Sequence, residues 1–224
     1  MPGASPPSSL WMQVLGQSLL GRRGIVKTAN LWLPLALLLV SRPAPAGASD
    51  AITCGWIFLA VFCWAQACIL GNDISDTRDD DASGKRRWIA QLPSLAGYLV
   101  VIFLSVIGAC SAYLAGKQPA APVIFVLALA LGLLYSFKPI RLKERGALGL
   151  WAYSFSAALA FAVTPWVILE HVGWHTLAVL IPAVFFDKWT NLHFHQLVDY
   201  EADRISNTQT YAAVSYTHLR AHET

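Results

Sequence analysis

Residues 51–81 read AITCGWIFLAVFCWAQACILGNDISDTRDDD and join an apolar run to a dense acidic segment. The first part, Ala51–Gly71, carries no charge and is long enough to cross a bilayer, which takes roughly 20 apolar residues in a helix. The second part places five carboxylates within Asp73–Asp81. Carboxylates at that density repel one another unless a cation binds them. We therefore expect a cation site at the end of a membrane helix.

The rest of the chain shares this apolar character. Its 224 residues are 56% hydrophobic and 13% charged, whereas soluble domains carry about 25% charged residues. Several further segments are apolar over a membrane-spanning length. The sequence predicts an all-α, polytopic membrane bundle of about six transmembrane helices, in residues 28–47, 51–71, 88–116, 118–137, 146–169 and 171–186, the last continuing toward Asn191.

Basic residues are distributed unevenly among the predicted loops, and Lys and Arg favour the cytoplasmic side of a membrane. With the N-terminus inside, only Arg42 and Lys117 fall in outer loops. The inner segments hold Arg22, Arg23, Lys27, Arg78, Lys85, Arg86, Arg87, Lys138, Arg141, Lys143, Arg145 and Arg204. We expect a multi-pass protein of the cell (inner) membrane whose active site faces the cytoplasm. The net charge of +3 reflects this topology, so no nucleic-acid partner is expected.

A second acidic pair, Asp199 and Asp203, follows the last predicted span at the spacing of one helical turn. In the first cluster, intervals of four residues place Asn72 or Asp73, Asp76 and Asp80 along one helix face. Magnesium takes few protein ligands and completes its shell with water and substrate phosphates. The two clusters predict divalent metals that hold a polyanionic substrate at the bilayer surface, with the ligands Asn72, Asp73, Asp76, Asp80, Asp199 and Asp203.

Two other interpretations of the first cluster remain open. It is either a solvated acidic loop or a calcium loop that starts at Asp79. In the second case Asp79–Gly84 supplies ligands at the first, third and fifth positions and glycine at the sixth. However, Ala90 stands at the twelfth position, where a calcium loop requires a bidentate glutamate.

Three motifs in order resemble those of the UbiA superfamily of intramembrane prenyltransferases, over roughly Lys27–Val214. They are the N-D-x-x-D-x-x-x-D of Asn72–Asp80, the D-x-x-x-D of Asp199–Asp203, and YSFKPIRLKERG at Tyr135–Gly146, which is similar to the family loop Y-S-x-x-P-x-R-L-K. The family's R-P-x-x-S-G segment is matched at Arg87, but Trp88 stands where proline is usual. Family members have about nine transmembrane helices of roughly 20 residues each.

The resemblance implies Mg²⁺-dependent transfer of a prenyl group from a prenyl diphosphate to an aromatic or other small acceptor within the membrane. It implies catalytic roles for Asp73, Asp76, Asp199 and Asp203, with Asp79, Asp81 and Glu201 in outer positions. The residues implied to bind diphosphate are Tyr135, Lys138, Arg141, Lys143, Lys85 and Arg87, although cytoplasmic loops are commonly basic without such a role.

The acceptor side of the expected site involves the helix before the second motif. Asn191 and His195 precede Asp199 and Asp203 at intervals of one turn, and we expect them to contact the acceptor, with His195 taking its proton. The alternative for His195 is an ordinary hydrogen-bonded polar residue. The acceptor is a hydroxybenzoate, naphthoate, homogentisate, tetrapyrrole, lipid or sugar-type molecule.

Two other functions use acidic clusters in membranes. A CDP-alcohol phosphotransferase needs D-x-x-D-G-x-x-A-R, but Thr77 follows Asp73–Asp76 and no Ala-Arg pair follows at the right place. A cation-coupled transporter usually binds its ions near the bilayer midplane, whereas both clusters here lie at helix ends.

The chain divides into three parts. Residues 1–24 are expected to form a flexible or interfacial tail, and residues 25–214 an incomplete transmembrane prenyltransferase domain. Residues 215–224 are polar and resemble translated sequencing-adapter read-through, so we expect a non-native tail on a C-terminally truncated fragment.

Overall fold

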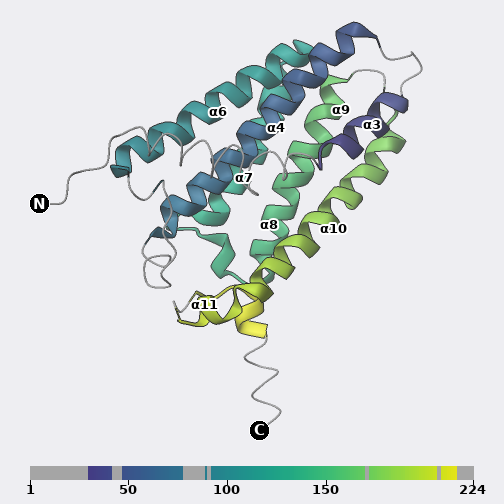
Figure 1. Cartoon of the computed structure of the whole chain (residues 1–224). Helices are drawn as coiled ribbons and strands as arrows, with labels where there is room; N and C mark the ends of the chain where they lie inside the picture. Colours follow the sequence, from purple (N-terminus) through teal and green to yellow (C-terminus); the bar gives the residue numbers. More distant parts are fainter. Residues whose placement is uncertain are drawn as a thin grey trace, which may run out of the picture.

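The computed structural model describes residues 30–41, 47–77, 89, 92–169, 172–205 and 208–215. Within these ranges the chain is helical and contains no strand, which confirms the all-α prediction (Figure 1). The helices are α3 (Trp32–Val40), α4 (Ala48–Ser75), α6 (Ser94–Gly116), α7 (Ala120–Ser136), α8 (Ala147–Ala158), α9 (Thr164–Ile168), α10 (Trp174–Val198) and α11 (Tyr200–Ile205). A 3₁₀ turn, η3 (Leu142–Glu144), precedes α8, and a π-helical segment, η4 (Leu159–Val163), joins α8 to α9.

Three helical segments of the described chain are long and apolar enough to cross a membrane. They are α4, α6 and the continuous Ala147–Ile168 formed by α8, η4 and α9. The prediction of six spans is not supported. The first predicted span yields only the nine residues of α3, and α7 has 17 residues. α10 is continuous, but Asp187 and Lys188 interrupt its apolar sequence.

The long helices run back and forth between the two ends of the bundle. Thr53, near the start of α4, donates a hydrogen bond to the carbonyl of Ala115, near the end of α6 (3.3 Å). At the other end Gly97 of α6 lies against Ile74 of α4. These two helices are therefore antiparallel. α7 packs against α4, α6 and α8, and α10 lies along α8 and η4 (Figure 1).

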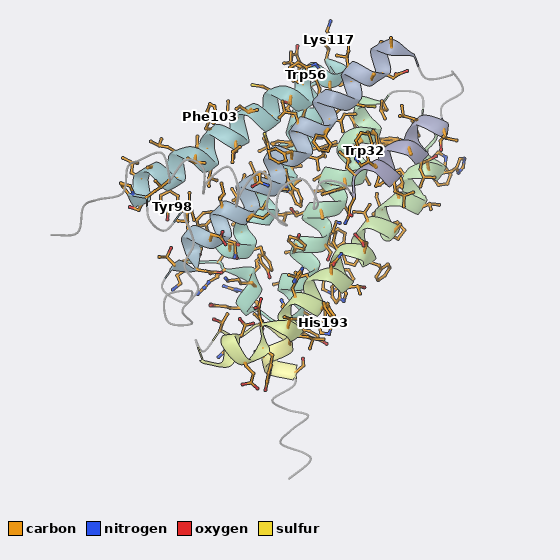
Figure 2. The ribbon with its side chains drawn as sticks, viewed as in Figure 1. Trp32, Trp56, Tyr98, Phe103, Lys117 and His193 are labelled. Atoms are coloured by element: carbon orange, nitrogen blue, oxygen red, sulfur yellow. The ribbon has the colours of Figure 1, made fainter. Side chains whose placement is uncertain are left out.

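Small residues let these helices approach closely. A Cβ on Gly108 would lie 2.3 Å from the Phe125 ring, and one on Gly132 would lie 2.4 Å from the Cys68 sulfur. Such contacts are typical of helix packing in membranes, where burial of apolar surface does not drive association. The outer face of α6 exposes large apolar side chains such as Phe103, as expected for a surface in contact with lipid (Figure 2).

The interior of the bundle contains one charged side chain from α10. Lys188 is 7% exposed. Its ammonium lies 2.8 Å from Asp187 and 4.9 Å from the centre of the Phe161 ring on η4. Phe161 in turn makes an edge-on contact with Trp64 of α4, with ring centres 5.6 Å apart. Lys188 is thus stabilised by a carboxylate and an aromatic face.

Candidate functional site

The last turn of α4 carries the first acidic cluster. The backbone N–H of Asp76 donates to the carbonyl of Asn72 (2.9 Å), so these two residues lie one helical turn apart, as predicted. Asp73 is buried, whereas Asn72 and Asp76 are half-buried. The carboxylates repel one another, and a helix C-terminus adds its own partial negative charge. Both effects favour a cation at this cluster. Asp79, Asp80 and Asp81 lie outside the described residues.

The loop between α7 and α8 is folded back against the end of α4. Arg141 adopts a left-handed backbone (φ 39°), and its N–H donates to the carbonyl of Phe137 (2.8 Å). On α8, a Cβ at Gly149 would lie 2.6 Å from the Leu142 carbonyl oxygen, so glycine allows the loop to lie directly on the helix. This local fold buries Arg141 and Lys143, each only 6% exposed.

Both buried cations face the first acidic cluster. Arg141 Nη2 lies 2.8 Å from Asp76 Oδ1. The Lys143 ammonium contacts both carboxylate oxygens of Asp76 and lies 3.4 Å from Asn72 Oδ1. The Ser136 hydroxyl donates to the same Asn72 oxygen (3.0 Å). The two residues that best match the expected diphosphate loop are therefore held on two of the expected metal ligands.

Further polar contacts fix this arrangement. The Ser75 hydroxyl donates to the Ser136 carbonyl (2.6 Å), which ties α4 to the end of α7. Glu144 lies 2.6 Å from Arg141 Nη1. Since Arg141 contacts a carboxylate on each side, its guanidinium is held in one orientation.

The second acidic cluster lies where α10 passes into α11. The Asp203 N–H donates to the Asp199 carbonyl (2.9 Å), which places these residues one turn apart, as predicted. The Thr210 hydroxyl donates to Asp203 Oδ2 (2.9 Å). In Figure 1, α11 lies at the same end of the bundle as the C-terminal ends of α4, α7 and α10.

A groove of about 530 Å³ lies against the α7–α8 loop. Its lining includes Lys138, Arg141 and Arg145 from the α7–α8 loop and Gln209, which follows α11. Glu144 also lines it, so three cations face one carboxylate and the groove is basic on balance. Its two bounding segments are about 70 residues apart in the chain. Lys138 is exposed here, whereas Lys85 and Arg87 lie outside the described residues.

Tyr135 at the end of α7 is close enough to both acidic clusters to feel their charge. Its hydroxyl is near the side-chain amide of Gln196 and within electrostatic range of both Asp76 and Asp203. Its ring packs on Tyr153 of α8, with centres 5.7 Å apart. Tyr135 is therefore near one carboxylate of each acidic cluster.

Gln196 is the residue of this region that the motifs did not indicate. It is buried on the face of α10 that also buries Leu180, Val184 and Lys188. Asn191 and His195, the expected acceptor residues, are exposed instead. Asn191 lines a shallow hollow on the outer surface of α10 with Phe186, Asp187, Thr190 and Phe194. The sequence did carry one signal for Gln196, because Lys188, Leu192 and Gln196 are spaced by four residues and so lie on one face of a helix.

The described oxygen donors suit a hard cation. Among described residues, no group of three or more His, Cys, Asp and Glu side chains has the geometry of a metal site. Yet the oxygens of Asn72 and Asp76 converge on one positive charge, the Lys143 ammonium. Carboxylate and amide oxygens around one cation are also what Mg²⁺ needs, with water and phosphate completing the shell. The oxygens of Asn72 and Asp76 therefore fit this metal.

Over the described residues, the fold and the site define a helical protein with three helices suited to a membrane and a charged site at one end of the bundle. The chain matches no protein-family model, no curated protein and no solved structure. The resemblance to the UbiA superfamily therefore rests on the three motifs, and the function has to be argued from the geometry of the site.

Proposed function

We propose that this chain transfers a prenyl group from a prenyl diphosphate to a small acceptor, with Mg²⁺, at the cytoplasmic end of the bundle. One observation carries the proposal. Two buried cations, Arg141 and Lys143, meet Asp76 at the end of an apolar bundle, and a second acidic cluster lies at the same end. A diphosphate on an isoprenoid chain has the matching division into a multiply charged head and an apolar tail.

Arg141 and Lys143 are suited to the diphosphate. A guanidinium offers a planar fork of donors that matches two phosphate oxygens, and an ammonium offers a compact charge. Both are attached to a loop fixed against α8, so little ordering is required when the anion binds. Lys138 and Arg145 in the adjoining groove add positive charge that attracts it.

Asn72, Asp73 and Asp76 on α4, and Asp199 and Asp203 on α10 and α11, would hold the metal. The chemistry supplied by Mg²⁺ held there would be positive charge beside the departing diphosphate. Tyr135, at the end of α7 and near the charge of Asp76 and Asp203, would turn its ring toward the positive charge left on the allylic carbon. The apolar helices would keep water away from that carbon.

The experiment is prenyl transfer by the purified protein in lipid nanodiscs, with Mg²⁺, labelled prenyl diphosphates of several lengths and a panel of acceptors. Asp76→Asn and Asp199→Asn are each expected to abolish transfer. Glu201→Gln is the matched control, because Glu201 is an exposed acid within the second motif, and it should retain activity. Near-normal rates in both aspartate variants would refute the metal assignment.

A further inference from the structure

The groove against the α7–α8 loop carries more positive charge than its own carboxylate can neutralise. Arg141 is already held by Asp76 (2.8 Å) and by Glu144, the carboxylate that lines the groove (2.6 Å). Lys138 and Arg145 are exposed, and within the described ranges neither makes an ion pair. The groove therefore presents two positive charges, which suit an anionic ligand.

Arg145 is oriented to bind an oxyanion. Its Nε donates to the Ile140 carbonyl (3.0 Å), and its backbone N–H donates to the Leu142 carbonyl (2.9 Å), so the loop itself holds the guanidinium. With Nε used in this way, the two Nη groups are the part of the side chain that can bind a ligand. A guanidinium binds phosphate oxygens as a planar fork, and Lys138 adds a compact charge in the same groove.

Exposed apolar side chains continue the groove along α8. The loop ends where the segment Ala147–Ile168, which is suited to a membrane, begins, so the groove would lie at the level of the lipid headgroups. Ile140 in the groove is exposed, as are Leu148 and Trp151 on the first turns of α8. The Leu148 N–H donates to the Arg145 carbonyl (3.3 Å), so the apolar surface starts directly beside the cation. Tryptophan is typical of a membrane interface at this depth.

We propose that this groove binds the headgroup of an anionic phospholipid from the surrounding bilayer. The Arg145 guanidinium contacts two oxygens of the phosphodiester, Lys138 adds its charge, and an acyl chain lies on Leu148 and Trp151. A phosphocholine headgroup fits poorly, because its trimethylammonium brings another positive charge beside the two cations. The inference goes beyond the proposed function and requires only that the helices lie in a bilayer.

A prenyl diphosphate is a less suitable occupant of the groove. It is multiply charged and binds with a divalent metal, whereas the described lining of the groove includes no aspartate. A phosphodiester carries a single negative charge and needs no metal. The apolar surface beside Arg145 is also on the exposed side of α8, so a chain lying on it would come from the bilayer.

The experiment is native mass spectrometry of the purified full chain in a neutral detergent, titrated with dioleoyl phosphatidylglycerol or dioleoyl phosphatidylcholine. The first phosphatidylglycerol is expected to bind about tenfold more tightly than the first phosphatidylcholine. Lys138→Gln and Arg145→Gln are each expected to weaken phosphatidylglycerol binding about fivefold, the usual effect of one basic residue on an anionic lipid. Lys138→Gln stays decisive if Arg145→Gln disturbs the loop, because the Lys138 side chain makes no hydrogen bond within the described chain.

Lys117→Gln is the matched control. Lys117 is also an exposed lysine at the end of an apolar helix, but it caps α6 at the opposite end of the bundle (Figure 2). Its replacement should leave binding of the first phosphatidylglycerol unchanged. Equal affinity for the two lipids, an unchanged phosphatidylglycerol affinity in Lys138→Gln, or an equal loss in Lys117→Gln would overturn the proposal.

Two competitors distinguish the lipid from other phosphates. Excess inorganic phosphate should leave phosphatidylglycerol bound, because it has no acyl chain to lie on α8. Displacement by inorganic phosphate would mean that the groove takes the free anion. Displacement by farnesyl diphosphate without metal would mean that the groove belongs to the prenyl donor. Either result would overturn the lipid site, whereas a lipid site in a chain without prenyl transfer would leave this inference standing.

Discussion

Replacing Asp76 by asparagine is expected to lower the free energy of unfolding by about 3–5 kcal/mol, the usual cost of removing one partner from a buried ion pair. The side chains of Asp76, Arg141 and Lys143 are 14%, 7% and 7% exposed, so water screens this cluster little. Asparagine keeps the size and an acceptor oxygen but removes the charge. Lys143 then carries a buried positive charge that no carboxylate at position 76 neutralises.

Two further variants separate this effect from general disturbance of the loop. Lys143→Gln should cost less, about 1.5–3 kcal/mol for a lost charged hydrogen bond, because Arg141 still neutralises Asp76. The double variant should be less destabilised than the sum of the two by about 1–3 kcal/mol, since each change removes part of the same interaction. Glu144→Gln is the control. Glu144 also contacts Arg141 but is 33% exposed, so about 1 kcal/mol or less is expected.

The assay is reversible denaturant unfolding in detergent micelles, followed by the fluorescence of the nine tryptophans. The midpoint and slope give the free energy of each variant. A cost for Asp76→Asn no larger than that of Glu144→Gln would refute the reasoning, because it would mean that the cluster is solvated. Strict additivity in the double variant would show that Asp76 and Lys143 do not interact.

Two other predictions concern the loop and the topology. Gly149→Ala should lower the free energy of unfolding by about 1–3 kcal/mol and weaken prenyl diphosphate binding, because the added Cβ would lie 2.6 Å from the loop backbone. Gly55→Ala is the control, since a Cβ there has nothing within 4 Å and should be tolerated. Unfolding and binding titrations of the two variants test this. In a chain without its natural cysteines, Ser94→Cys and Lys117→Cys at the two ends of α6 should react with an impermeant maleimide from opposite sides of sealed vesicles, and labelling from one side would contradict a membrane-spanning α6.

The sequence predicted the fold class because the relevant signal is composition, which needs no knowledge of packing. It also predicted that the first motif begins on a helix. α4 continues beyond the end of the uncharged run at Gly71 and carries Asn72 and Asp73 in its last turn. The count of about six spans is not supported, because an uncharged run is not always a helix of spanning length. The run at residues 118–137, for example, yields α7, which has only 17 residues.

The sequence could not predict which face of α10 lies inward, and the reason is physical. In a soluble helix, apolar residues mark the buried face. In a membrane bundle the outward face is apolar as well, so α10 exposes Phe186 and Phe194 while burying Lys188 and Gln196. The polar residues of this helix are therefore spread around it. Spacing alone aligned Asn191 and His195 with the acidic motif, and only the packing of α10 on α8 shows that Gln196 faces inward.

The contacts at Asp76 impose an order on any binding event at this site. Arg141 and Lys143 neutralise Asp76 in the ligand-free chain, so a diphosphate alone would have to take cations from a buried carboxylate and leave it uncompensated. A metal alone would meet a cluster that already carries two positive charges. If metal and diphosphate bound together, Asp76 would hold the metal, and Arg141 and Lys143 would be free to contact the phosphate oxygens. Only joint binding leaves neither Asp76 nor the two cations without an opposite charge. The affinity for a prenyl diphosphate should therefore depend steeply on the Mg²⁺ concentration if this charged end is the active site.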